Sequence, residues 1–144
     1  MWKWCSATGF VAVLFASSVA HAEMATLAGA WSFRAVHAAA DCTITGDAVV
    51  RDTSTRDVYE VSLVATETCG GLSNTPVEQS CRATRSGDSV LVDCVVLYPD
   101  RAPGYLPDDF ELVVQAPNVM VGRLTANWNQ PAVWRRGVSD APVA

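Results

Sequence analysis

Hydrophobic and polar residues alternate along the chain between residues 31 and 136, as in strands that bury one face and expose the other. Turn signals rich in glycine, proline, aspartate and asparagine interrupt the alternation about every 8 to 14 residues. No helical period continues beyond a single turn. The pattern therefore predicts eight short strands. Their expected positions are Trp31–Ala35, Cys42–Arg51, Val58–Thr68, 77–86, 89–97, Phe110–Gln115, Met120–Ala126 and Ala132–Arg136.

Eight consecutive strands, each with one apolar face, predict an all-β domain that folds as an antiparallel up-and-down β-barrel. The alternative is a β-sandwich, which buries the same faces between two sheets. We favour the barrel because its closure removes the exposed strand edges that a sandwich retains.

The segment Cys81–Cys94 is symmetric about a Gly-Asp pair at positions 87 and 88, a dipeptide suited to a two-residue hairpin turn. Counting outward from this turn places Cys81 directly opposite Cys94, as a non-hydrogen-bonded pair whose side chains approach closely. A disulfide fits there. The same register joins opposite charges and apolar side chains, Arg82 with Asp93 and Ala83 with Val92.

The first 22 residues have the features of a secretory signal peptide. Lys3 supplies a positive charge, an apolar run covers residues 9–20, and Ala20-His21-Ala22 is a small-x-small cleavage site. The roughly 12 apolar residues are too few for the ~20 that a membrane-spanning helix needs, which disfavours a membrane anchor. We expect a signal peptide over residues 1–22, a single β-barrel domain over residues 23–144, and a periplasmic or secreted protein in an oxidising compartment.

Cleavage would remove Lys3, the only lysine, and leave nine basic residues, all arginine, against fifteen acidic ones. The resulting net charge of −6 argues against nucleic acid as a partner. Four cysteines remain, and four cysteines allow three disulfide connectivities. The hairpin symmetry selects Cys81–Cys94 and leaves Cys42 with Cys69, which share the inward parity of adjacent strands. We expect them to meet across that hairpin, with a diagonal offset or a bulge as alternatives.

Few residues are suited to catalysis or metal binding. His37 is the only histidine that remains after signal removal, and its surroundings, residues 37–41, indicate a solvated loop. The cysteines are assigned to disulfides, so no thiolate metal site is expected. We interpret the acidic residues of a later segment as a solvated loop without EF-hand spacing, namely Asp100, Asp108, Asp109 and Glu111. We therefore expect no catalytic residue, no cofactor and no metal, and predict that the protein is not an enzyme.

Two loops are longer than a hairpin requires. Residues 99–107 contain three prolines and the apolar pair Tyr105-Leu106, and residues 69–76 begin at a disulfide cysteine. Restrained loops on a rigid barrel are common recognition sites, and the alternative is that both only cap the barrel ends. Glu67 and Arg85 interrupt the inward face near strand ends, where we expect them to reach solvent.

The first strand opens with LAGAW at residues 27–31, which contains a Gly-x-Trp motif, and the last strand ends with Arg135 and Arg136. A Gly-x-Trp opening combined with a basic residue in the last strand resembles the signature of the calycin barrels, which include the lipocalins. This resemblance implies that Arg135 or Arg136 lies over Trp31 and closes the bottom of the barrel.

The Leu-x-Gly-x-Trp opening and a Cys42–Cys69 bridge between the second and third strands are also similar to small secreted bacterial inhibitors of alkaline metalloproteases, over about the first two thirds of the chain. The second disulfide and residues 98–130 depart from the inhibitor pattern. In that family the short segment before the barrel enters the protease cleft. The resemblance implies that the matching residues would contact the partner here, namely Glu23, Met24, Ala25 and Thr26.

Our leading hypothesis is a non-enzymatic binding module that acts through protein contacts, with a secreted protease or another envelope protein as its partner. Tyr105 and Leu106 offer a second contact surface. The first alternative is a lipocalin-like carrier of a small apolar ligand inside the barrel. Because eight strands enclose a space that side chains just fill, we expect a filled core instead. The second alternative is an envelope structural protein without a specific ligand.

Overall fold

The structure, a computed structural model, describes residues 26–126 and 129–137. The expected signal peptide and the residues Glu23, Met24 and Ala25 lie outside the described residues. The strands are β1 (Gly29–His37), β2 (Cys42–Asp52), β3 (Val58–Cys69), β4 (Leu72–Ser73), β5 (Val77–Ser86), β6 (Ser89–Val96), β7 (Phe110–Ala116), β8 (Val119–Leu124) and β9 (Gln130–Arg136). Two short 3₁₀ helices lie in the connections, η1 (Ala38–Ala40) and η2 (Pro99–Arg101).

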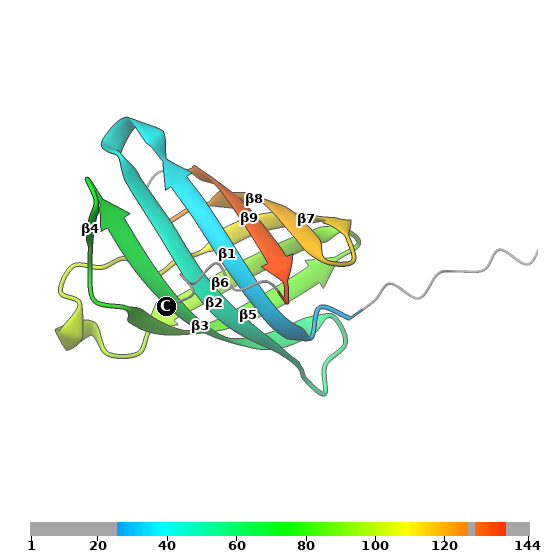
Figure 1. The fold of residues 1–144 in the computed structure, drawn as a ribbon. Helices are drawn as coiled ribbons and strands as arrows, with labels where there is room; N and C mark the ends of the chain where they lie inside the picture. Colours follow the sequence, from blue (N-terminus) through cyan, green and yellow to red (C-terminus); the bar gives the residue numbers. More distant parts are fainter. Residues whose placement is uncertain (1–25, 127–128, 138–144) are drawn as a thin grey trace, which may run out of the picture.

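Eight of these strands close into an antiparallel barrel (Figure 1). The sheet order is β2-β1-β9-β8-β7-β6-β5-β3, and a further pairing of β2 with β3 completes the ring. The predicted barrel is therefore confirmed, and the sandwich is not formed. β4 pairs with β3 outside the ring. It was not predicted, because two residues are too short to produce an alternating pattern.

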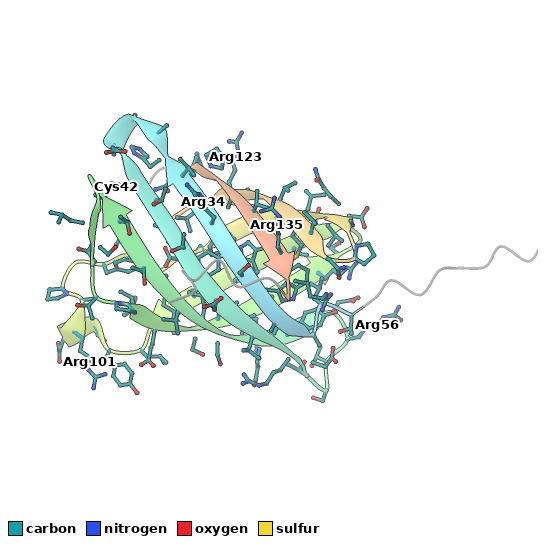
Figure 2. All side chains as sticks on the ribbon, in the orientation of Figure 1. Arg34, Cys42, Arg56, Arg101, Arg123 and Arg135 are labelled. Atoms are coloured by element: carbon teal, nitrogen blue, oxygen red, sulfur yellow. A yellow bond between two sulfur atoms is a disulfide. The ribbon has the colours of Figure 1, made fainter. Side chains whose placement is uncertain are left out.

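The two ends of the barrel differ. The open end is formed by η1 and by the connections that follow β3, β6 and β8, whereas the closed end carries the tight turns after β2, β5 and β7. Figure 2 shows Cys42 and Arg101 at the open end and Arg56 at the closed end. Thr26 and Gly137, the first and last described residues, both lie at the closed end, because Thr26 hydrogen-bonds Asp52 and Gly137 hydrogen-bonds Ala30.

Three aromatic side chains fill the middle of the barrel. The Trp134 ring stacks on Phe33 with centroids 5.2 Å apart, and both meet the Phe110 ring edge-on, at 5.1 Å and 5.3 Å. Gly46 lies directly against Phe33, since a Cβ added at Gly46 would be 2.3 Å from the Phe33 Cζ. The predicted inward parity of the strands is confirmed by this core.

Both predicted disulfides are present, Cys42–Cys69 and Cys81–Cys94. Cys42 stands directly opposite Cys69 in the β2–β3 register, so neither a diagonal offset nor a bulge is needed. Arg82 stands opposite Asp93 as predicted. However, no salt bridge joins these two described residues, whereas Arg56 and Asp57 do form an ion pair.

Strand limits differ from the predictions at the open end. β8 ends at Leu124 instead of Ala126, and β9 begins at Gln130, two residues before the predicted start. His37 is the last residue of β1, and its Nδ1 accepts a hydrogen bond from the Ala40 N–H at 3.0 Å, which closes the η1 turn. Within residues 26–126 and 129–137, no helix has the length and apolar character to cross a membrane.

Candidate functional site

Arg136 closes one end of the barrel. Its guanidinium lies over the Trp31 ring, 4.4 Å from the centroid, and donates hydrogen bonds to the carbonyl oxygens of Ala28, Thr26 and Pro117. The Trp31 indole N–H donates in turn to the Leu27 carbonyl at 2.8 Å. Of the two arginines at the end of β9, Arg136 occupies this place, whereas the Arg135 side chain is exposed (Figure 2).

The three described residues that were predicted to contact a partner lie at opposite ends of the barrel. Thr26 is held at the closed end, where its hydroxyl donates to the Asp52 carboxylate at 2.8 Å and its carbonyl accepts from Arg136. Tyr105 and Leu106 belong to the β6–β7 connection at the open end. These residues therefore do not form one continuous surface.

A pocket of about 220 Å³ lies in the mouth of the open end. Its wall combines apolar side chains with polar side chains from β1, β3, the β6–β7 connection and β9. The lining includes Ile44, Glu67, Tyr105, Leu106, Asp108 and Gln130. The pocket also includes His37 and the disulfide residue Cys42. The aromatic core lies deeper in the barrel and contributes none of the lining residues.

Asp108 anchors the β6–β7 connection to the barrel. The carboxylate Oδ2 accepts hydrogen bonds from the Gln79 side-chain amide at 2.6 Å and from the Tyr105 hydroxyl at 2.8 Å, and the Asp108 N–H donates to Gln79 Oε1 at 2.8 Å. Asp108 is only 2% exposed. The interpretation of this residue as part of a solvated acidic loop is therefore wrong.

Burial sets the protonation of this network. Desolvation raises the pKa of Asp108 to about 6, although the hydrogen bonds from Gln79 and Tyr105 oppose the shift. Desolvation also raises the pKa of Tyr105, with the Asp108 charge adding to the effect, so the phenol stays protonated and remains a donor. Near neutral pH the Asp108 carboxylate therefore accepts the hydrogen bond and the Tyr105 hydroxyl donates it.

The neighbouring Asp109 replaces a missing strand partner. β7 pairs with β6 only as far as Val92, so the backbone of Cys94 has no neighbour in β7. The Asp109 Oδ1 accepts the Cys94 N–H at 2.7 Å instead. Burial raises the pKa of Asp109. The acidic pair at positions 108 and 109 therefore fixes the loop on both sides, to β5 and to β6.

Gln130 carries a buried acceptor without a partner. The residue is 5% exposed, and its Oε1 receives no hydrogen bond from the described residues. The Ser32 hydroxyl and the Trp134 indole N–H are also buried without a hydrogen-bond partner among the described residues, but only Gln130 lines the open-end pocket. An unpaired buried polar atom costs about 1 to 3 kcal/mol, which a hydrogen-bonding ligand would recover.

Glu67 and Arg85, two other polar residues on inward strand faces, differ in their exposure to solvent. Glu67 lines the pocket mouth, in agreement with its expected position. Arg85 is only 8% exposed, so the expectation that it reaches solvent is wrong, and its Nε donates to the Gly87 carbonyl at 2.9 Å. Within the described ranges, no group of three potential metal ligands occurs.

Sequence reasoning missed Gln79 and Gln130. Both share the inward parity of apolar neighbours, Gln79 with Val77 and Cys81, and Gln130 with Trp134. A polar residue on an otherwise apolar strand face was the available signal. It indicates a buried side chain that needs a partner.

No family model matches the chain, and searches of curated proteins and of solved structures find no match. The calycin and inhibitor resemblances stay predictions that depend on sequence motifs. The pocket itself offers hydrogen-bond acceptors beside apolar walls, an arrangement suited to binding a molecule or side chain that carries donors.

Proposed function

We propose that this protein is a non-enzymatic binding module that acts through protein contacts at the open end of its barrel, in the periplasm or outside the cell. The observation that carries this proposal is the β6–β7 connection, which is anchored to the barrel by buried hydrogen bonds and exposes apolar side chains to solvent. The β6–β7 connection is held by the buried Asp108 network, while several of its side chains are exposed, namely Leu97, Tyr98 and Leu106.

Such a loop is pre-organised for recognition. Ordering a mobile loop on binding consumes part of the interaction free energy, and a loop that is already fixed avoids this loss. The Arg101 guanidinium covers the Tyr98 ring at 4.3 Å, which further restrains the exposed end. Leu72 of β4, 80% exposed, adds an apolar side chain at the same end of the barrel. Apolar side chains gathered on one end are typical of protein interaction sites.

The filled interior favours protein contacts over transport of an apolar ligand. The packed rings of Phe33, Phe110 and Trp134 occupy the space in which a carrier would hold its ligand. The pocket above them, about 220 Å³, is smaller than the roughly 300 to 1,000 Å³ of typical ligand sites and contains two carboxylates.

Site-specific photocrosslinking tests this proposal. A photoreactive residue at position 106 should capture a discrete protein partner in the compartment where the protein resides. Position 91 is the matched control, because Leu91 is equally an exposed leucine but lies on β6 toward the closed end. Leu106→Asp should abolish co-purification of the captured partner. Equal adducts at both positions, or none at position 106, would contradict the proposal.

Inhibition of a secreted protease is a second candidate function. It is favoured by the hydrogen bonds that hold Thr26 in place. Arg136 and Asp52 fix this residue, so the segment that precedes it starts from a defined point on the closed end. Deletion of residues 23–25 retains the Thr26 contacts and should abolish inhibition of a zinc metalloprotease without changing the free energy of unfolding. Absence of inhibition by the mature chain across a panel of secreted metalloproteases would exclude this candidate.

A further inference from the structure

We propose that the open-end pocket binds a primary ammonium group on a short aliphatic chain. A lysine side chain of a protein partner and a free alkyl amine share this chemistry. The inference deepens the proposed function, since an inserted lysine side chain would anchor the protein contact at the open end.

Gln130 supplies an acceptor that lacks a hydrogen-bond donor. Gln130 is one of the lining residues, and its side-chain Oε1 is buried and has no donor among the described residues. Buried acceptors of this kind are rare because water or a protein donor normally pairs with them. A ligand that carries N–H donors would restore the missing hydrogen bond.

The charged side chains of the pocket lining are acidic. Asp108 and Glu67 both line the pocket, and no arginine or lysine is among the lining residues of the described chain. Both hydrogen bonds to the Asp108 carboxylate go to Oδ2, which leaves Oδ1 without a donor in the described segments. The Tyr105 hydroxyl is already committed to Asp108. The carboxylates of the lining therefore accept hydrogen bonds and carry negative charge, which favours a cation with several donors, such as an ammonium group.

The size of the pocket and the apolar part of its wall suit a short aliphatic chain. Ile44, Leu106 and Leu124 offer aliphatic surface beside the carboxylates. The volume of about 220 Å³ corresponds to roughly seven water molecules at ~30 Å³ each. This space suits a chain of a few methylene groups, whereas Phe33 and Trp134 block any deeper insertion of a long apolar molecule.

The titration of the pocket supports the same ligand. Because burial raises the pKa of Asp108 to about 6, the carboxylate is charged at pH 7.5 and binding should weaken as the pH falls below about 6. The other ionisable groups around it are Glu67 on β3, His37 on β1, and Tyr105 and Asp109 on the β6–β7 connection.

The test is a calorimetric titration of the mature protein at pH 7.5 with n-butylammonium chloride. n-Butanol and sodium butyrate serve as neutral and anionic probes of the same length. We expect saturable binding of butylammonium only. Asp108→Asn, which retains an acceptor oxygen for Gln79 and Tyr105, should weaken butylammonium binding at least tenfold.

The Gln130→Leu variant distinguishes an effect on ligand binding from an effect on stability. This variant removes the unpaired acceptor, so its midpoint of thermal unfolding should rise while butylammonium binding weakens at least tenfold. Ser32→Ala is the matched control, because it removes another unpaired buried acceptor that does not line the pocket. It should also raise the midpoint, but it should leave butylammonium binding unchanged.

Nα-acetyl-lysine N-methylamide distinguishes the two sources of the ammonium group. Binding of this probe as tightly as butylammonium would assign the pocket to a lysine side chain of a partner, and binding of butylammonium alone would assign it to a free amine. Absence of binding by both probes, or equal binding by Gln130→Leu and the unchanged protein, would overturn the inference. The proposed function would then still be judged separately by crosslinking at position 106.

Discussion

The Arg136 guanidinium lies 4.4 Å from the centroid of the Trp31 ring and joins the last strand of the barrel to the first. The two residues face each other in the β1–β9 register. Arg136 also donates to the carbonyl groups of Ala28 and Thr26, which precede β1. One side chain therefore links the last strand both to the first strand and to the residues that precede it, and it covers the closed end of the barrel.

Arg136→Ala should lower the free energy of unfolding by about 1 to 3 kcal/mol, since it removes the contact with Trp31 and several charge-assisted hydrogen bonds. Arg135→Ala is the matched control, because the neighbouring Arg135 is exposed and its loss should change stability by less than about 0.5 kcal/mol. Urea denaturation of both variants measures the difference. Equal stability of the two variants would contradict the closing role of Arg136.

Asp108 should make the protein less stable as the pH rises from about 4 to about 6. The folded state holds the proton with a pKa of about 6, above the ordinary value of 3.8, so the stabilisation by this group is complete below about pH 4 and is lost as the pH passes 6. The difference corresponds to roughly 2 to 3 kcal/mol. It is measured by subtracting the unfolding free energies of Asp108→Asn from those of the unchanged protein at each pH.

The subtraction is needed because other carboxylates lose favourable interactions in acid and mask the effect of Asp108. Asp108→Asn does not titrate, so relative to the unchanged protein it should gain stability between pH 4 and 6 and keep that gain at pH 7.5. A difference curve that is flat, or that slopes in the opposite direction, would show that burial does not destabilise the charged form of the Asp108 side chain.

Loss of either disulfide should destabilise the barrel without changing its topology. Replacing Cys81 and Cys94 by alanine should cost about 3 kcal/mol, and replacing Cys42 and Cys69 slightly more, because their sequence separations are 13 and 27 residues. Chemical denaturation measures both effects. Peptide mapping without reduction verifies the pairing, and a peptide that links Cys69 to Cys81 would contradict the strand register.

Gly46→Ala should destabilise the protein by about 2 kcal/mol or more, because a methyl group at this position would lie 2.2 Å from the Val64 carbonyl oxygen and 2.3 Å from the Phe33 ring. The packed interior cannot move to accommodate it. Thermal unfolding measures the effect. An unchanged midpoint would mean that the interior has free space, and would revive the carrier interpretation.

The strands and the disulfides were predictable from the sequence because both depend on local information. Period-two alternation identifies the inward face of each strand, and the distance from the turn after Ser86 fixes which residues stand opposite each other. Cys81 and Cys94 needed no knowledge of distant parts of the chain. β4 escaped prediction because two residues carry no period.

The pocket was less predictable because its groups are far apart in sequence. Gln79 and Asp108 are separated by 29 residues, and their hydrogen bond depends on how the β6–β7 connection crosses the barrel mouth. Local composition favours solvation for Asp108, since prolines and other acidic residues surround it. The inward position of Gln79 indicated that a buried polar partner was needed but did not identify it.

The chain enters and leaves the barrel on the same side. Thr26 and Gly137 are both at the closed end, and the pocket is at the other. A linker, fluorescent reporter or solid support attached at Thr26 or Gly137 would therefore lie at the end of the barrel opposite the mouth. Immobilisation through either of these residues would leave the mouth facing away from the support, an orientation that suits display and sensing at a surface.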